Sequence, residues 1–209
     1  MSRLRRALAV SVVLPLVLAA CATDPNVSVE LPDPAFKVDV DVDTPQLRAL
    51  KKDADVESCQ EGDATARDVP DGMPDVVLPC LGGGPDVNLS TLRGPMVINL
   101  WAPWCGPCRD ELPYYQQLHE QAGDTVQVLG IDYQDTQPKR ALELIGDTGV
   151  TYPLLADPAG QIRAPFRVRG LPGVLFVDDD GNVVHLEYTV IRSYEQLRDL
   201  VEEHLDVTV

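Results

Sequence analysis

The sequence predicts an α/β domain in three layers, a sheet between helices, and three observations point to this class. Residues 96–101 are apolar without alternation, which is typical of a strand buried on both faces. A helix pattern follows at 105–119, then a strand pattern at 125–132 and a second helix pattern at 138–145. Because a helix between two strands makes a parallel crossover, the centre of the sheet is expected to be parallel or mixed.

The remaining elements flank this centre. Residues 74–89 contain two short strand patterns around the glycine-proline turn Gly82–Pro85, so they are expected to form an N-terminal hairpin. A second hairpin is predicted at 174–190, with its turn at Asp178–Gly181. The last helix pattern, at 193–205, begins with a Ser and a Gln three residues apart, which is a capping box.

Two cysteines lie at the predicted turn from strand to helix, in the stretch Trp101-Ala-Pro-Trp-Cys-Gly-Pro-Cys108. Their spacing favours redox chemistry or zinc ligation. A zinc site would need a second ligand pair, and the other cysteines lie upstream and singly. Since a helix N-terminus stabilises a thiolate, Cys105 is the predicted attacking thiol. Cys108, almost one turn further into the helix and less accessible, is predicted to resolve the mixed disulfide.

The stretch Trp101–Cys108 resembles the active-site motif of thioredoxins. Together with Glu111–Pro113 it is similar to the extracytoplasmic thioredoxin-like reductases of the ResA and TlpA type. The resemblance covers about 72–205. It implies a thioredoxin-like three-layer α/β/α sandwich with an N-terminal β-hairpin and an inserted helix at 138–145. It also implies dithiol–disulfide exchange that needs no cofactor.

The resemblance implies three residues that meet the substrate. Pro172 is expected to be the cis-proline of the family, beside the active-site disulfide. The backbone of Leu171 would then pair with an extended substrate segment, and Trp104, next to Cys105, would contact the same segment.

The sequence departs from the thioredoxin pattern at the group that would move the proton of the second thiol, because Asn99 stands where thioredoxins carry a buried carboxylate. An amide cannot act as a base. Glu111 lies three residues after Cys108, a spacing that puts both on one helix face. Glu111 either tunes Cys108 or relays its proton, or else it is a first-turn acid that satisfies the helix dipole.

The N-terminus has the layout of an export signal. Three arginines precede an apolar run, Ala7–Ala20, which is too short for an ordinary transmembrane helix. The stretch Leu18-Ala-Ala-Cys21 resembles the lipobox of bacterial lipoproteins, in which the cysteine is lipidated. The alternative is a plain signal peptide cut near Ala20. The expected location is the extracytoplasmic face of the cell membrane.

Three segments are therefore predicted: a lipoprotein signal peptide at 1–20, a lipid-anchored acidic tether at 21–70 and the thioredoxin-like domain at 71–209. The tether contains several prolines and few large apolar residues, so it is expected to be extended. The formal net charge of −16 disfavours binding to nucleic acid or to an anionic lipid surface.

Cys59 and Cys80 remain, and in an oxidising compartment leftover pairs usually form disulfides. A bridge between them would close a loop of roughly twenty residues and stabilise the fold by about 3 kcal/mol. It is either a structural disulfide or a second redox couple that passes electrons to Cys105.

The predicted function is exchange of a dithiol or disulfide with exported proteins. The Gly-Pro pair between the cysteines favours a reductase fed by a membrane electron donor, with a role in cytochrome c maturation as one candidate. A membrane electron acceptor would instead drive disulfide formation. A peroxidase would carry Thr where Ala102 stands, and a redox-inactive binding module would keep its activity without Cys105 and Cys108. No metal site is predicted, since no paired His spacing occurs.

Overall fold

The computed structural model describes residues 38–63, 69, 72–123 and 125–209, all of which belong to the unit Phe36–Val209. The predicted signal peptide, Cys21 and the first part of the predicted tether lie outside the described residues. Within the described part of the chain, no helix is long and apolar enough to cross a membrane.

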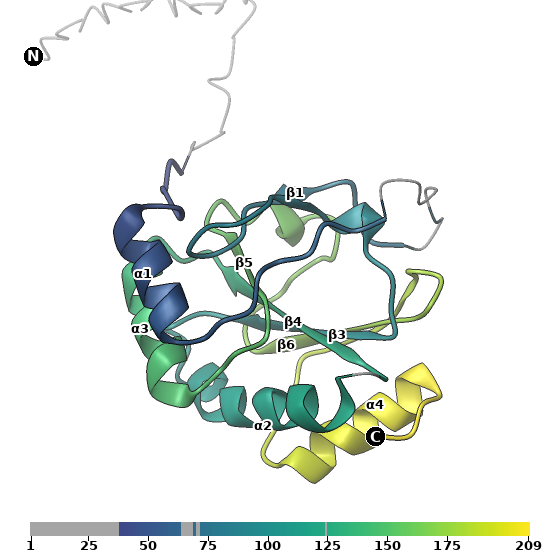
Figure 1. Ribbon diagram of the computed structural model, residues 1–209. Coiled ribbons are helices and arrows are strands. Elements are labelled where there is room, and N and C mark those ends of the chain that lie inside the picture. Colours follow the sequence, from purple (N-terminus) through teal and green to yellow (C-terminus); the bar gives the residue numbers. More distant parts are fainter. Residues whose placement is uncertain (1–37, 64–68, 70–71, 124) are drawn as a thin grey trace, which may run out of the picture. The chain divides into compact units, whose positions relative to one another are not determined.

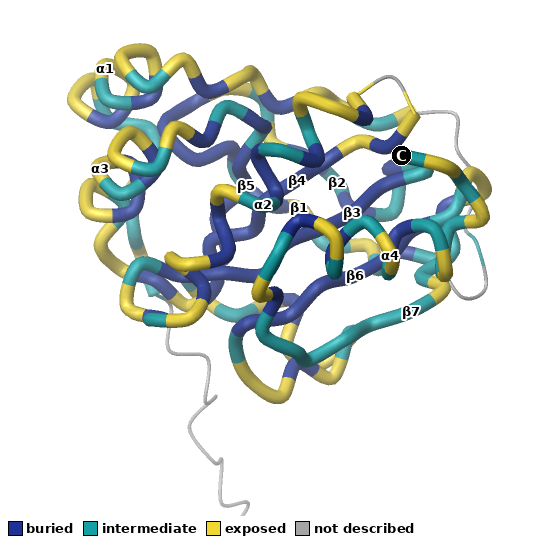
Figure 2. The backbone as a smooth tube through the Cα atoms, turned by 90° about the horizontal axis from the view of Figure 1, so that it is seen from below, coloured by how far each residue is buried: buried dark blue, intermediate teal, exposed yellow. Residues whose placement is uncertain are grey.

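The core of the fold is a five-stranded mixed sheet in the order β5-β4-β3-β6-β7. Its strands are β3 (Met96–Trp101), β4 (Gln127–Tyr133), β5 (Leu154–Asp157), β6 (Gly173–Val177) and β7 (Val183–Glu187). Strand β3 runs parallel to β4, and β4 runs parallel to β5. Strand β6 is antiparallel to β3, and β7 is antiparallel to β6. Every residue of the central strand β3 is buried, as its unbroken apolar pattern predicts (Figure 2).

The four α-helices of the described residues pack on one face of this sheet: α1 (Pro45–Asp53), α2 (Gly106–Ala122), α3 (Pro138–Thr148) and α4 (Tyr194–Leu205). Figure 1 shows α2 and α4 running below the strands, with α1 beside α3. The reason is topological. The crossovers through α2 and α3 step across the sheet in the same direction, and right-handed crossovers in one direction put their helices on one face.

The opposite face carries the short hairpin of β1 (Val77–Leu78) and β2 (Val87–Asn88). Two 3-10 helices complete this layer, η1 (Leu89–Thr91) and η2 (Gln161–Arg163). The thioredoxin-like fold class, the N-terminal hairpin and the inserted helix, α3, are confirmed. In the described part of the chain, this second face carries the hairpin and the two 3-10 helices, whereas the α-helices lie on the other face.

The prediction of an extended tether is wrong for part of its range, because α1 lies there. Thr44 caps the helix by accepting a hydrogen bond from the Leu47 N–H at 3.3 Å, and Pro45 occupies the first turn. Leu47 is buried against the domain, and α1 packs on α3. The folded part of the chain therefore begins before residue 71.

Candidate active site

The two cysteines of the motif lie where β3 gives way to α2, joined by a disulfide with their Cα atoms 5.3 Å apart. Cys105 is the N-cap residue of α2, and its sulfur accepts a hydrogen bond from the Cys108 N–H at 3.3 Å. Cys105 is 6% exposed and Cys108 is 1% exposed. An incoming thiol therefore reaches Cys105 first, and the helix N-terminus stabilises the charge that develops there.

The segment before β6 reaches the same end of the sheet. Leu100 pairs with Gly173, so Pro172 lies next to the last residue of β3, just before the cysteine turn. The Leu171–Pro172 peptide bond is cis, as expected. Leu171 is partly buried and contacts the cores on both faces of the sheet.

Trp104 is 58% exposed, which is rare among the large apolar side chains in the described part of the chain. It borders a pocket of about 230 Å³ beside the cysteine turn. The other residues around this pocket are Pro103, Arg109, Asp135, Gln137 and Arg140. The surface next to Cys105 therefore combines an exposed indole with two arginines, which suits an extended polypeptide carrying apolar and acidic side chains.

Glu111 is fully buried in α2, and neither carboxylate oxygen makes a hydrogen bond of good geometry to the described residues. Burial raises its pKa to about 8, Asp110 adds to the shift, and the backbone N–H of Ile191 opposes it. The alternative that Glu111 is a first-turn acid is wrong, because α2 begins at Gly106 and its first turn contains no acid.

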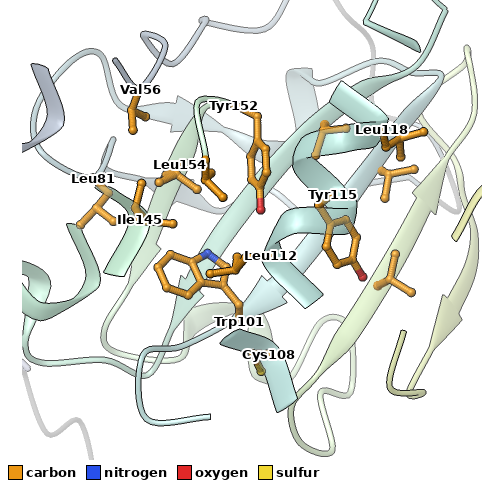
Figure 3. Packing of buried hydrophobic residues seen from close by; sticks show 14 of the residues in the cluster. Val56, Leu81, Trp101, Cys108, Leu112, Tyr115, Leu118, Ile145, Tyr152 and Leu154 are labelled. Atoms are coloured by element: carbon orange, nitrogen blue, oxygen red, sulfur yellow. The ribbon is translucent and has the colours of Figure 1, made fainter. Parts of the chain in front are cut away.

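Two buried tyrosines, Tyr115 and Tyr152, lie in the same apolar core as Cys108 (Figure 3), and both are near enough to Glu111 to respond to its charge. Burial raises the pKa of Tyr115 and of Tyr152, and in both the negative charge of Glu111 adds to the shift. Asn99 donates a hydrogen bond from Nδ2 to the Tyr152 hydroxyl at 3.4 Å. A polar cluster of a carboxyl, two phenols and an amide thus lies inside the apolar core that includes Cys108.

The sequence analysis missed Tyr152, because it lies between α3 and β5, where no periodic pattern marks a buried position. It also missed a buried acidic pair, Asp132 and Asp135. The register puts Asp132 opposite Trp101 at the active-site end of the sheet. Burial raises the pKa of both carboxyls, and for Asp132 the neighbouring charge of Asp135 adds to the shift.

Cys59 and Cys80 form the second disulfide, with a Cα–Cα distance of 5.9 Å, as the cysteine count predicts. Both are buried, at 3% and 1% exposure. In the described part of the chain, no group of three or more His, Cys, Asp or Glu side chains is placed to hold a metal ion.

Comparison with known proteins decides the family. A family model described as "AhpC/TSA family" matches residues 69–186, more than half of the chain. The chain belongs to the AhpC/TSA family. The thiol-disulfide oxidoreductase ResA of Geobacillus kaustophilus is 30% identical over 145 residues, which is 68% of this chain and 79% of that protein. The thiol:disulfide interchange protein DsbE of Haemophilus influenzae is 36% identical over 95 residues, 45% of this chain and half of that protein.

Solved structures agree with these relatives. The structure of MTB DsbF, in mixed oxidised and reduced forms, superposes with a TM-score of 0.55 at 30% identity, covering 62% of this chain and 94% of that one. A protein disulfide isomerase homologue from Bacteroides thetaiotaomicron gives a TM-score of 0.54 at 30% identity, covering 68% and 92%. The AhpC/TSA chain described here is thus a thiol-disulfide oxidoreductase of the ResA and DsbE type, with the thioredoxin-like fold.

Proposed function

We propose that this oxidoreductase works outside the cytoplasm as a reductase of exported proteins, attached to the membrane by lipid on Cys21. The observation that carries the direction is the buried carboxyl of Glu111 on the helix face of Cys108. Strong oxidants owe their potential to a stabilised dithiol form with a thiol of low pKa. Burial keeps the Glu111 carboxyl largely protonated up to about pH 8, and its ionised form, on the helix face of Cys108, would oppose ionisation of that thiol, which favours the disulfide and hence a reducing potential.

In the proposed reaction, the Cys105 thiolate attacks one sulfur of a substrate disulfide. A mixed disulfide forms, and the other substrate sulfur leaves as a thiolate and takes a proton. Cys108 then passes its proton to Glu111, whose pKa of about 8 leaves a fraction of the carboxyl ionised near neutral pH, and attacks the Cys105 sulfur. The second substrate sulfur leaves as a thiol, and Cys105 and Cys108 are left as a disulfide. A membrane electron donor returns two electrons, and two protons follow, to regenerate the dithiol.

The substrate segment would lie across the cysteine turn. The backbone of Leu171 and the ring of Pro172 would hold it on one side, and the exposed Trp104 would contact it on the other. Arg109 and Arg140, which line the pocket beside Trp104, favour substrates with acidic side chains near the reacting cysteine.

Apocytochrome c is a candidate substrate, because its haem-attaching cysteines must be reduced before the haem is joined to them.

Export and lipidation are supported by the charged N-terminal residues, the apolar run and the small residues before Cys21. Globomycin-type inhibition of lipoprotein processing, or a Cys21→Ser change, is expected to release the chain from the membrane fraction.

The direction is tested by the reduction potential of Cys105–Cys108 in the full chain, measured against glutathione, with alkylation of the resting thiols in cells. A potential near that of thioredoxin, about −270 mV, with the dithiol at rest supports the reductase. A potential near about −120 mV with the disulfide at rest identifies an oxidant. If function in cells survives replacement of both Cys105 and Cys108 by serine, the chain is a binding module instead.

A further inference from the structure

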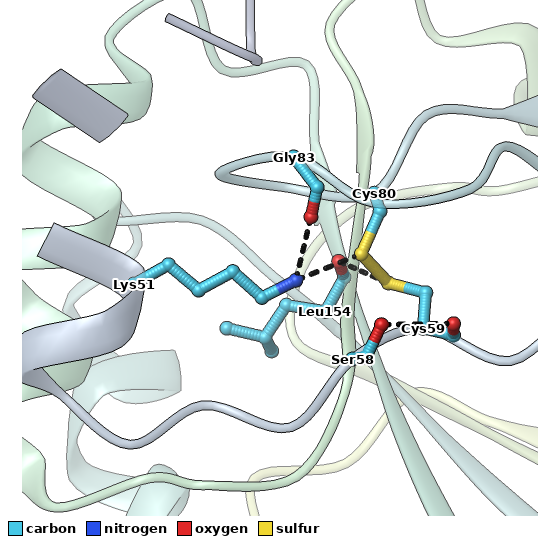
Figure 4. The surroundings of a disulfide bond; sticks show 6 residues. All are labelled: Lys51, Ser58, Cys59, Cys80, Gly83 and Leu154. Carbon is cyan, nitrogen blue, oxygen red and sulfur yellow. Dashed lines mark hydrogen bonds between the residues drawn. A yellow bond between two sulfur atoms is a disulfide. The ribbon is translucent and has the colours of Figure 1, made fainter. Parts of the chain in front are cut away.

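The second disulfide has a charged neighbour that a purely structural disulfide does not need. Lys51, from α1, extends its side chain to the Cys80 sulfur, with Nζ 2.9 Å from Sγ, and donates a second hydrogen bond to the Gly83 carbonyl at 2.9 Å (Figure 4). Lys51 is only 7% exposed. In the described part of the chain it makes no ion pair within 4 Å.

A buried ammonium without a paired anion is unfavourable, and burial lowers the pKa of Lys51, with only the charge of Asp43 opposing the shift. A disulfide sulfur is a weak hydrogen-bond acceptor and carries no charge. A cysteine thiolate at the same place would be the missing counter-charge. The surroundings of Cys80 thus fit the reduced state better than the oxidised one.

Cys59 also has a neighbour that suits its reduced form. Its sulfur lies 3.2 Å from the Leu154 carbonyl oxygen (Figure 4), but a disulfide sulfur has no proton to donate to that oxygen. A thiol at Cys59 would donate one. The protein therefore offers each sulfur of the reduced pair its own partner: an acceptor for a Cys59 thiol and a cation for a Cys80 thiolate.

Cys59 also lines a pocket of about 570 Å³, a volume typical of a site for a small molecule. The pocket lies at the starting end of β3, around Met96, whereas the Cys105–Cys108 disulfide follows Trp101 at the other end. Cys59 and Cys80 belong to the core beneath the hairpin and Cys105 and Cys108 to the core on the helix face, so the sheet lies between the two disulfides. The partner proposed for Cys59 is therefore one that comes from outside the chain.

We propose that Cys59–Cys80 is a second thiol–disulfide exchange site, which reacts with a low-molecular-weight thiol entering the pocket beside Cys59. The thiolate of the small thiol attacks the Cys59 sulfur and forms a mixed disulfide. The Cys59–Cys80 bond breaks, and its electron pair leaves on Cys80 as a thiolate held by Lys51. A second small thiol then releases Cys59 as a thiol, so that two thiols are oxidised to one disulfide while the protein pair is reduced.

The test uses the full chain in detergent with Cys21, Cys105 and Cys108 replaced by serine, so that only Cys59 and Cys80 carry thiols. Equilibration with reduced and oxidised glutathione, followed by alkylation and mass spectrometry, gives the ratio of dithiol to disulfide. Lys51→Met is expected to lower this ratio at least tenfold, which corresponds to about 30 mV. Lys52→Met, a change at the exposed neighbour on the same helix, is the matched control and is expected to leave the ratio unchanged.

Two further readouts keep the proposal falsifiable if Lys51→Met does not fold. In the chain that keeps Lys51, absorbance at 240 nm is expected to show a Cys80 thiolate that persists below the ordinary pKa of a cysteine, about 8.5, and the glutathione adduct is expected on Cys59. Equal ratios for Lys51→Met and Lys52→Met, loss of the folded circular dichroism spectrum on reduction, or an adduct on Cys80 would each overturn the proposal. Because Cys105 and Cys108 are absent throughout, these results are independent of the reductase function.

Discussion

The two disulfides of this chain show how differently a protein can surround the same bond. Cys105–Cys108 joins residues three apart at a helix N-terminus, with a buried carboxyl on the same helix face. Cys59–Cys80 joins residues 21 apart, with a buried ammonium 2.9 Å from one sulfur. A carboxyl opposes the thiolate and a cation stabilises it. The two sites are therefore expected to have different potentials, the first more reducing and the second more oxidising.

The largest expected effect comes from substitutions at the Cys105–Cys108 site. Cys105→Ser should abolish reduction of a protein disulfide, because no attacking thiol remains. Cys108→Ser should also stop turnover, but it should accumulate a mixed disulfide between Cys105 and the substrate, visible on a non-reducing gel. Turnover in the Cys105→Ser chain would mean that another residue performs the reaction.

Glu111→Gln tests the effect of the buried carboxyl at the Cys105–Cys108 site. The pKa of Glu111 is raised to about 8 in the folded chain, so the folded state holds a proton that the unfolded state has released. The contribution of Glu111 to the free energy of unfolding should therefore be fully present below pH 4.5 and should be lost as the pH rises to about 8. The loss is up to about 5 kcal/mol.

Glu111→Gln should remove this part of the pH dependence in urea unfolding measured from pH 5 to pH 8. It should also change the pH profile of the reductase reaction, because Cys108 loses its proton acceptor. A profile identical to that of the unmodified chain would rule out proton transfer through Glu111. Glu120→Gln, near the exposed end of the same helix, is the control.

Removing the second disulfide tests what it contributes while oxidised. Replacing Cys59 and Cys80 together by alanine should lower the free energy of unfolding by about 3 kcal/mol, since the unfolded chain loses a crosslink. Reductase turnover at Cys105 should change less than twofold. If turnover collapsed while the circular dichroism spectrum stayed folded, Cys59 and Cys80 would instead pass electrons to the first site.

The smallest expected effect concerns the helix that carries Lys51. Thr44→Ala removes the N-cap of α1 and should cost about 1 kcal/mol. Ser193→Ala removes the N-cap of α4 and should cost a similar amount. Only Thr44→Ala should change the rate at which glutathione reacts with Cys59–Cys80, because only α1 holds Lys51 in place. If both variants reacted with glutathione at equal rates, α1 would have no effect on the reactivity of the Cys59–Cys80 disulfide.

The first site was largely predictable from the sequence, and the second was not. Cys105 and Cys108 belong to a local motif, so neighbouring residues specify them, whereas the cis bond at Pro172 was expected only from the family resemblance. Helix α1 was missed because it is short and lies in a longer stretch that is acidic overall and poor in large apolar residues, and packing on α3 provides the stability that composition does not show. Lys51 was missed because its contact with Cys80 joins residues 29 apart, and no spacing rule covers such a pair.

The sheet places the two disulfides in separate surroundings. Cys105 and Cys108 belong to the core on the helix face, whereas Cys59 and Cys80 belong to the core beneath the hairpin. Substitutions in regions that share no partner usually have additive effects on stability. A double-mutant cycle between Cys108→Ser and Cys59→Ser is therefore expected to show a coupling below about 0.5 kcal/mol. Each site can then change by mutation without constraining the other, so one chain can hold two redox functions that evolve independently.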